Sequence, residues 1–162
     1  MARFRKVDPR IWNDAKFMAL GDDSKLIFLF ALTHPGLTIL GAMRATIPGL
    51  ADELGWTPER FAKGFAEPLS EGLFSYDKNG RLLWIKNYLK YNQIENPNQL
   101  VAAISALDLI PECATKYHVY QSLAVFSERF NKPLPEPLPK PLPEPFAEPL
   151  PKPVTRAVAV AG

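Results

Sequence analysis

The feature that most restricts which fold this sequence can adopt is a predicted β-hairpin near the middle of the chain. Two short apolar runs, 73–76 and 81–85, flank a polar segment that ends in Asn79-Gly80. Asn-Gly is the strongest short-range hairpin signal, because both residues tolerate the positive φ of a type I′ turn. Before Gly72 the apolar residues recur with a helical period, so the chain changes there from helix to hairpin.

Two predicted helices joined by a short turn precede this hairpin. Thr46 and Pro48 are typical of a helix start, and Gly55 is typical of a helix end. Thr57 and a following proline start the second helix, whose apolar residues recur every four positions; Pro68 inside it is expected to kink or shorten it. Helix, turn, helix and hairpin in this order predict a winged helix-turn-helix, a mainly α fold with a small β-hairpin wing.

Further elements are predicted on both sides of this unit. Asp22 or Asp23 is expected to cap an apolar helix that runs to Thr33, and the β-prone segment 37–43 is a candidate first strand. After the wing, Asn96 followed by proline predicts a helix to about 109, and a last helix is expected over 111–130. These helices would extend the winged-helix domain at its C-terminal side.

A proline repeat marks the end of the predicted domain. Ten of the 17 prolines lie between 133 and 153, in four-residue units such as Pro-Leu-Pro-Glu at 133–136. Proline fixes φ and lacks an amide donor, which favours an extended polyproline II rod over a packed core. We therefore predict a winged-helix domain with its helical extension over 1–130 and a disordered proline-rich tail over 131–162. The tail would be a stiff spacer or, alternatively, a ligand for an aromatic groove.

The residue pattern shows no sign of a catalytic site, a cofactor site or a membrane-spanning segment. One cysteine, Cys113, and two histidines far apart in the sequence supply neither a disulfide framework nor a metal site. No phosphate loop or nucleophile elbow is present, so we expect no enzyme and no cofactor. The N-terminus lacks the apolar region of a secretory signal, and the longest apolar run, 26–32, is too short to span a bilayer. A cytoplasmic protein that does not enter a membrane is therefore expected.

Local clusters of cations point to nucleic acid more clearly than the net charge of +2 does. The exposed face of the second helix would bring Thr57, Arg60 and Lys63 to a DNA groove. Around the wing, four cations against one aspartate give a local charge of +3, and the first sixteen residues also carry +3. These groups would contact phosphates without reading sequence. The expected phosphate-binding residues are Lys78, Arg81, Lys86 and Lys90 around the wing and Arg3, Arg5 and Lys6 in a flexible N-terminal arm.

Several segments of the chain, in the same order, resemble a known group of domains. They include Arg-Lys-Val-Asp-Pro-Arg-Ile-Trp-Asn-Asp at 5–14 and Leu-Trp-Ile-Lys-Asn-Tyr-Leu-Lys-Tyr-Asn at 83–92, with further matches at 20–28, 32–35, 41–44, 47–56 and 110–113. Residues 3 to 126 resemble the N-terminal winged-helix domains of phage and prophage replication-initiation proteins of the DnaD and replisome-organiser type. The resemblance implies binding to double-stranded DNA at a phage origin in the bacterial host cell, self-association, and recruitment of the host replicative helicase or its loader.

Two other functions remain open on the same pattern. Winged helices also serve as transcriptional regulators, because the fold alone does not decide the role. The low net charge and the acidic residues on the second helix equally suit a protein-interaction adaptor that binds a host factor and not DNA.

Overall fold

The computed structural model describes residues 4–136. Its elements, in chain order, are η1 Pro9–Asn13, α1 Ala15–Met18, α2 Asp22–Thr33, β1 Ala42–Arg44, α3 Ile47–Glu53, α4 Pro58–Ser70, β2 Phe74–Asp77, β3 Leu82–Ile85, α5 Tyr88–Tyr91, α6 Pro97–Asp108, α7 Ala114–Ser122 and α8 Ala124–Phe130. The fold is mainly helical, as expected, and the hairpin belongs to one small antiparallel sheet of three strands. Segments 1–3 and 137–162 lie outside the described residues, and with them Arg3 and most of the predicted tail.

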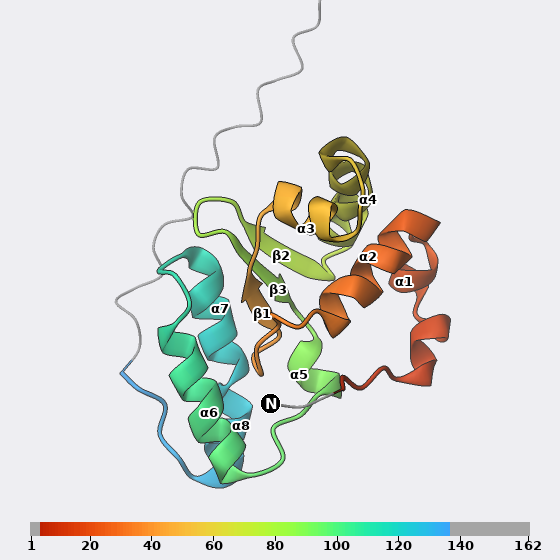
Figure 1. The fold of residues 1–162 in the computed structure, drawn as a ribbon. Coiled ribbons are helices and arrows are strands. Elements are labelled where there is room, and N and C mark those ends of the chain that lie inside the picture. Colours follow the sequence, from red (N-terminus) through yellow and green to blue (C-terminus); the bar gives the residue numbers. More distant parts are fainter. Residues whose placement is uncertain (1–3, 137–162) are drawn as a thin grey trace, which may run out of the picture.

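The sheet lies between two groups of helices (Figure 1), with α2, α3 and α4 on one side and α6, α7 and α8 on the other. Its strand order is β1-β3-β2, so the last strand in sequence is the central one. All four residues of β3 are buried, and Trp84 pairs with Ala42 of β1 and Ser75 of β2. A four-residue apolar run bounded by turn residues thus becomes the middle of the core.

The helix starts follow local capping chemistry. Thr46, Thr57 and Asn96 each accept a hydrogen bond from the amide three residues on, which confirms all three predicted starts. The predicted cap of α2 is wrong, because Gly21 is its N-cap and makes no side-chain cap bond. The Gly21 amide instead donates to Glu67 Oε2 at 2.8 Å, so a side chain of α4 holds the residue at the start of α2.

Helix α4 continues through Pro68 to Ser70, so the expected shortening does not occur. A proline removes the amide that would bond the carbonyl four residues earlier, which here is that of Gly64. The Ser24 hydroxyl on α2 donates to this carbonyl at 2.7 Å, and Ser24 is 1% exposed. A side chain from the neighbouring helix therefore replaces the hydrogen bond that Pro68 eliminates.

This replacement predicts a coupling between Ser24 and Pro68. We expect Ser24→Ala to lower the free energy of unfolding by about 1–3 kcal/mol, because it leaves the buried Gly64 carbonyl without a donor. In a Pro68→Ala background the amide of residue 68 can serve that carbonyl, so the same change should cost less than half as much. Urea unfolding of the two single variants and the double variant measures the difference. Equal costs in both backgrounds would show that Ser24 does not compensate for Pro68.

Two longer elements predicted from sequence are shorter in the structure. The candidate strand 37–43 is reduced to Ala42–Arg44, because the hydroxyl and the amide of Thr38 both donate to the Ala42 carbonyl and close a local turn. The last predicted helix is two helices that meet at Leu123, and the first of them begins only at Ala114. Ser122 donates back to the Val119 carbonyl, a local bond that competes with a continuous helix.

The hairpin is confirmed, but its predicted turn type is wrong. Asp77 pairs with Leu82, so four residues form the turn, and the residue with positive φ is Arg81 at 51°. The Gly80 amide donates to Asp77 Oδ1 at 2.6 Å, which closes the turn through a side chain. The turn also lies against α7, since a Cβ built on Gly80 would be 3.4 Å from Cys113 Sγ.

Packing continues beyond the predicted domain boundary at residue 130. Leu134 packs against the core, and the Tyr120 hydroxyl donates to the Pro135 carbonyl at 2.7 Å. The first Pro-Leu-Pro unit of the repeat is therefore in contact with the folded body.

Candidate nucleic-acid interface

The turn of the hairpin presents two of the predicted cations. Lys78 and Arg81 are both exposed on it. The Ala45 amide donates to the Arg81 carbonyl at 2.8 Å, which fixes the turn to the segment after β1. Their backbone is thus held while their side chains reach solvent.

Arg44 joins this pair and was missed in the sequence. It ends β1, is exposed, and stands opposite Leu82, the residue after Arg81. Arg44 and Arg81 line an open cavity of about 430 Å³ together with Thr46 at the start of α3. A lone arginine after an apolar segment gives no signal by itself, since only the β1–β3 register brings it beside the hairpin turn.

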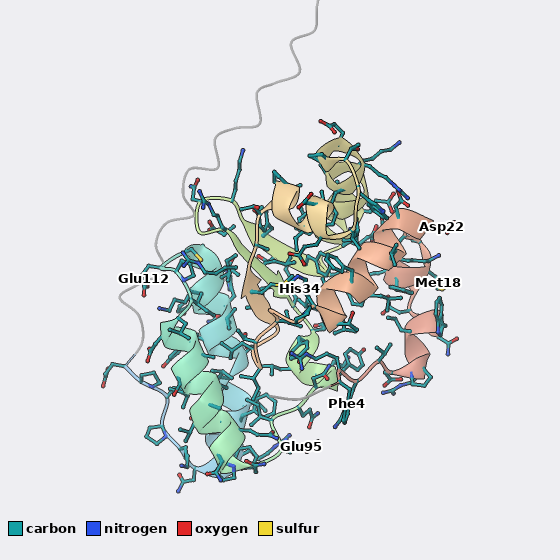
Figure 2. The ribbon with its side chains drawn as sticks, viewed as in Figure 1. Phe4, Met18, Asp22, His34, Glu95 and Glu112 are labelled. Atoms are coloured by element: carbon teal, nitrogen blue, oxygen red, sulfur yellow. The ribbon has the colours of Figure 1, made fainter. Side chains whose placement is uncertain are left out.

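Among the described residues, Glu53 is the one carboxylate that lines this cavity, and it is already paired. His34 Nε2 lies 2.6 Å from Glu53 Oε2, and His34 Nδ1 accepts from the Gly36 amide at 2.9 Å. Because Nδ1 is an acceptor, Nε2 carries the ring proton and donates it to Glu53. Figure 2 shows His34 where α2 ends and the chain turns toward β1.

The other two predicted wing cations lie at the opposite end of the hairpin. Lys86 follows β3 and Lys90 lies on α5, and both are exposed. At about 3.3 Å per residue, five residues put the backbone of Lys86 roughly 16 Å from that of Arg81. The four cations therefore form two separate pairs and not the single surface that the sequence suggested.

Arg60 is held against α2. Its Nε and NH2 groups each donate to one oxygen of Asp23 at 2.9 Å, and its guanidinium carbon lies 3.8 Å from the centre of the Trp56 ring. The hydrogen bonds from Arg60 lower the pKa of the Asp23 carboxyl. A fork of this kind fixes the guanidinium in place, so Arg60 does not stand free on the outer face of α4.

The rest of the predicted recognition face is weakly charged. Thr57 uses its hydroxyl to accept the Arg60 amide at 3.3 Å, as a cap. Lys63 is exposed but lies between Glu59 and Glu67, one helical turn away on either side. Cations and carboxylates therefore nearly balance on α4.

The expectation of a flexible arm is wrong for Arg5 and Lys6. An Arg5 NH2 group donates to the Leu37 carbonyl at 2.7 Å, and Lys6 Nζ lies 2.7 Å from Glu95 Oε1. The Lys6 amide also donates to Asn92 Oδ1 at 2.9 Å. Figure 2 shows Phe4 and Glu95 near α5, where this segment meets the body. Long-range hydrogen bonds of this kind have no counterpart in local sequence.

No family model, curated protein or solved structure matches this chain. Within residues 4–136, no group of three or more His, Cys, Asp or Glu side chains could hold a metal ion. In the same residues no helix combines the length and apolar character needed to cross a membrane. The candidate interface therefore rests on the geometry of the cations alone.

Proposed function

We propose that α2 to β3 form a winged helix-turn-helix, with α3 and α4 as the paired helices and β2–β3 as the wing. Two features support this assignment. The order is helix, strand, helix, helix, strand, strand, and the first strand pairs with the last to give the sheet order β1-β3-β2. The turn between α3 and α4 is short, with Gly55 at a φ of 69°.

The proposed activity is binding of double-stranded DNA through the wing. The observation that carries it is the placement of Arg44, at the end of β1, beside Lys78 and Arg81 of the exposed hairpin turn. Three cations against the single turn carboxylate of Asp77, which accepts from the Gly80 amide, leave this end of the hairpin positive and suit the phosphate backbone. Glu53, which lines the neighbouring cavity, is paired with His34. Contacts of this kind position a protein on DNA without reading its sequence.

The proposed role is initiation of phage or prophage DNA replication in the bacterial cytoplasm, by binding and not by catalysis. This step rests on the resemblance of residues 3–126 to replication-initiation domains, which also suggests self-association and the host replicative helicase or its loader as partners. A transcriptional regulator would use the same wing and differs in the DNA segment that it selects.

A protein-interaction adaptor is the second candidate, and the surface of α4 favours it. Arg60 is engaged by Asp23, and the remaining cation, Lys63, lies between two glutamates. A helix with this charge balance is poorly suited to a DNA groove and better suited to a protein surface.

Binding of the purified protein to short duplexes tiled across its own gene neighbourhood tests the proposal. We expect binding that weakens strongly between about 50 and 200 mM salt. Preference for a repeat-containing segment away from promoters supports replication, and preference for the protein's own promoter supports transcription. A dissociation constant of about 10 µM at moderate salt lies within the range of non-specific DNA binding. If no duplex binds more tightly than that, DNA is not the partner and the adaptor function replaces it.

A further inference from the structure

A cleft separate from the wing lies between the N-terminal segment 6–14 and α5. Its volume is about 360 Å³, near the lower end of the range of small-ligand sites. The apolar side chains that line it include Phe17, Phe28, Leu32, Leu73 and Ile85, which are buried or partly buried and which we call its floor. Folded domains leave few voids of this size against buried side chains, so the cleft is suited to a compact apolar group from outside.

The rim of the cleft offers a ring face and free amides. Tyr91 lines it and is 39% exposed, and Lys90 Nζ lies 5.5 Å from the centre of the Tyr91 ring. The side-chain amides of Asn13 and Asn87 also line it and form no hydrogen bond with any described residue. An asparagine amide can donate and accept along the edge of a nucleobase, and a tyrosine ring can stack on its face.

The charged groups of the rim favour an anion. Of the residues that the structure describes, three cations and two carboxylates line the cleft, which leaves a net charge of +1. Both carboxylates and two of the cations are already engaged. Asp8 accepts from the Arg10 guanidinium at 2.6 Å, Asp14 accepts from the Phe17 amide at 2.9 Å, and Lys6 Nζ lies 2.7 Å from Glu95 Oε1. Lys90 forms no ion pair with the described residues and stands beside Tyr91. A ligand with a flat apolar part and neighbouring negative charges fits this arrangement.

We propose that this cleft binds an unpaired base of a single-stranded nucleic acid, with the base over the apolar floor and against Tyr91. Asn13 and Asn87 bond the edge of the base, and Lys90 contacts a flanking phosphate. The site goes beyond duplex binding by the wing and does not depend on it. Because the two sites lie at opposite ends of the β2–β3 hairpin, the protein would be able to hold an opened strand next to intact duplex.

An abasic strand tests the proposal on the unaltered protein. Fluorescence anisotropy compares a labelled single strand of about 12 nucleotides, within the usual site size, with a strand of the same length that lacks its bases. We expect the abasic strand to bind about tenfold more weakly, the loss typical of one stacked base. An RNA strand of the same sequence distinguishes the two sources of an unpaired base, and binding of either supports the cleft.

Variants locate the site. Tyr91→Ala and Asn87→Ala are expected to weaken single-strand binding about tenfold and to leave duplex binding within about twofold. Tyr117→Ala, which removes a partly buried tyrosine of α7 outside the cleft, is the matched control and should change neither. Equal binding of the intact and abasic strands would overturn the proposal, as would single-strand binding lost only when Lys78 and Arg81 are removed. That last outcome would leave the proposed duplex function of the wing intact, so the two proposals fail separately.

Discussion

Gly41→Ala is expected to lower the free energy of unfolding by about 3–5 kcal/mol, a large fraction of the stability of a small domain. Gly41 has a φ of +72°, and a Cβ built on it would lie 2.3 Å from Cβ and Cγ of Tyr88. The backbone cannot move aside easily, because the Gly41 amide donates to Thr38 and its carbonyl accepts from Ile85. Tyr88 is 5% exposed and is packed in the core, so it cannot move aside either.

Gly72→Ala is the matched control for this prediction. Gly72 has the same φ of +72°, but a Cβ there would meet no atom within 4 Å. Its replacement should therefore cost only the backbone strain of a left-handed residue, about 1 kcal/mol. Urea or thermal unfolding followed by circular dichroism measures both variants. Equal losses of unfolding free energy in the two variants would show that the close approach of Tyr88 to Gly41 does not contribute to the cost of Gly41→Ala.

Removal of the three wing cations is the second prediction of large effect. The triple variant Arg44→Ala, Lys78→Ala and Arg81→Ala is expected to bind duplex DNA about 10- to 100-fold more weakly at low salt. The loss should be similar for all duplex sequences, because phosphate contacts carry no base information. All three side chains are exposed, so the fold should be retained, and circular dichroism checks this.

The double variant Lys86→Ala and Lys90→Ala distinguishes the contribution of the wing to duplex affinity from that of the far end of the hairpin. The sequence suggested that all four cations near the hairpin act together, whereas β3 holds the two pairs roughly 16 Å apart. If the wing turn contacts duplex DNA, this double variant should retain most of the duplex affinity. A loss as large as that of the triple variant would mean that both ends of the hairpin contact the duplex.

Features that depend on neighbouring residues could be predicted from the sequence. The caps at Thr46, Thr57 and Asn96 involve a side chain and an amide three residues away, so the signal is complete within one turn. The hairpin was predictable for the same reason, since two apolar runs and a polar turn of four residues define it. The turn type was not, because the Asp77 carboxylate closes the turn and moves the positive φ to Arg81.

Features that depend on residues far apart in the chain could not be predicted. The effect of Pro68 depends on Ser24, and the orientation of Arg60 depends on Asp23, both across the α2–α4 contact. The position of Arg44 beside Arg81 depends on strand register. In each case the sequence supplies the chemical group and only the packing supplies its partner.

The most direct test of the wing as a duplex-binding surface is the salt dependence of affinity. The logarithm of the binding constant for one duplex is measured against the logarithm of salt concentration for the native protein, the triple wing variant, and a control with Lys16→Ala and Arg129→Ala on α1 and α8. Each lost phosphate contact should flatten the slope by about 0.9, so the wing variant should flatten it by up to about 2.7 and the control should leave it unchanged. The same slope for the native protein and the wing variant would contradict DNA binding by the wing.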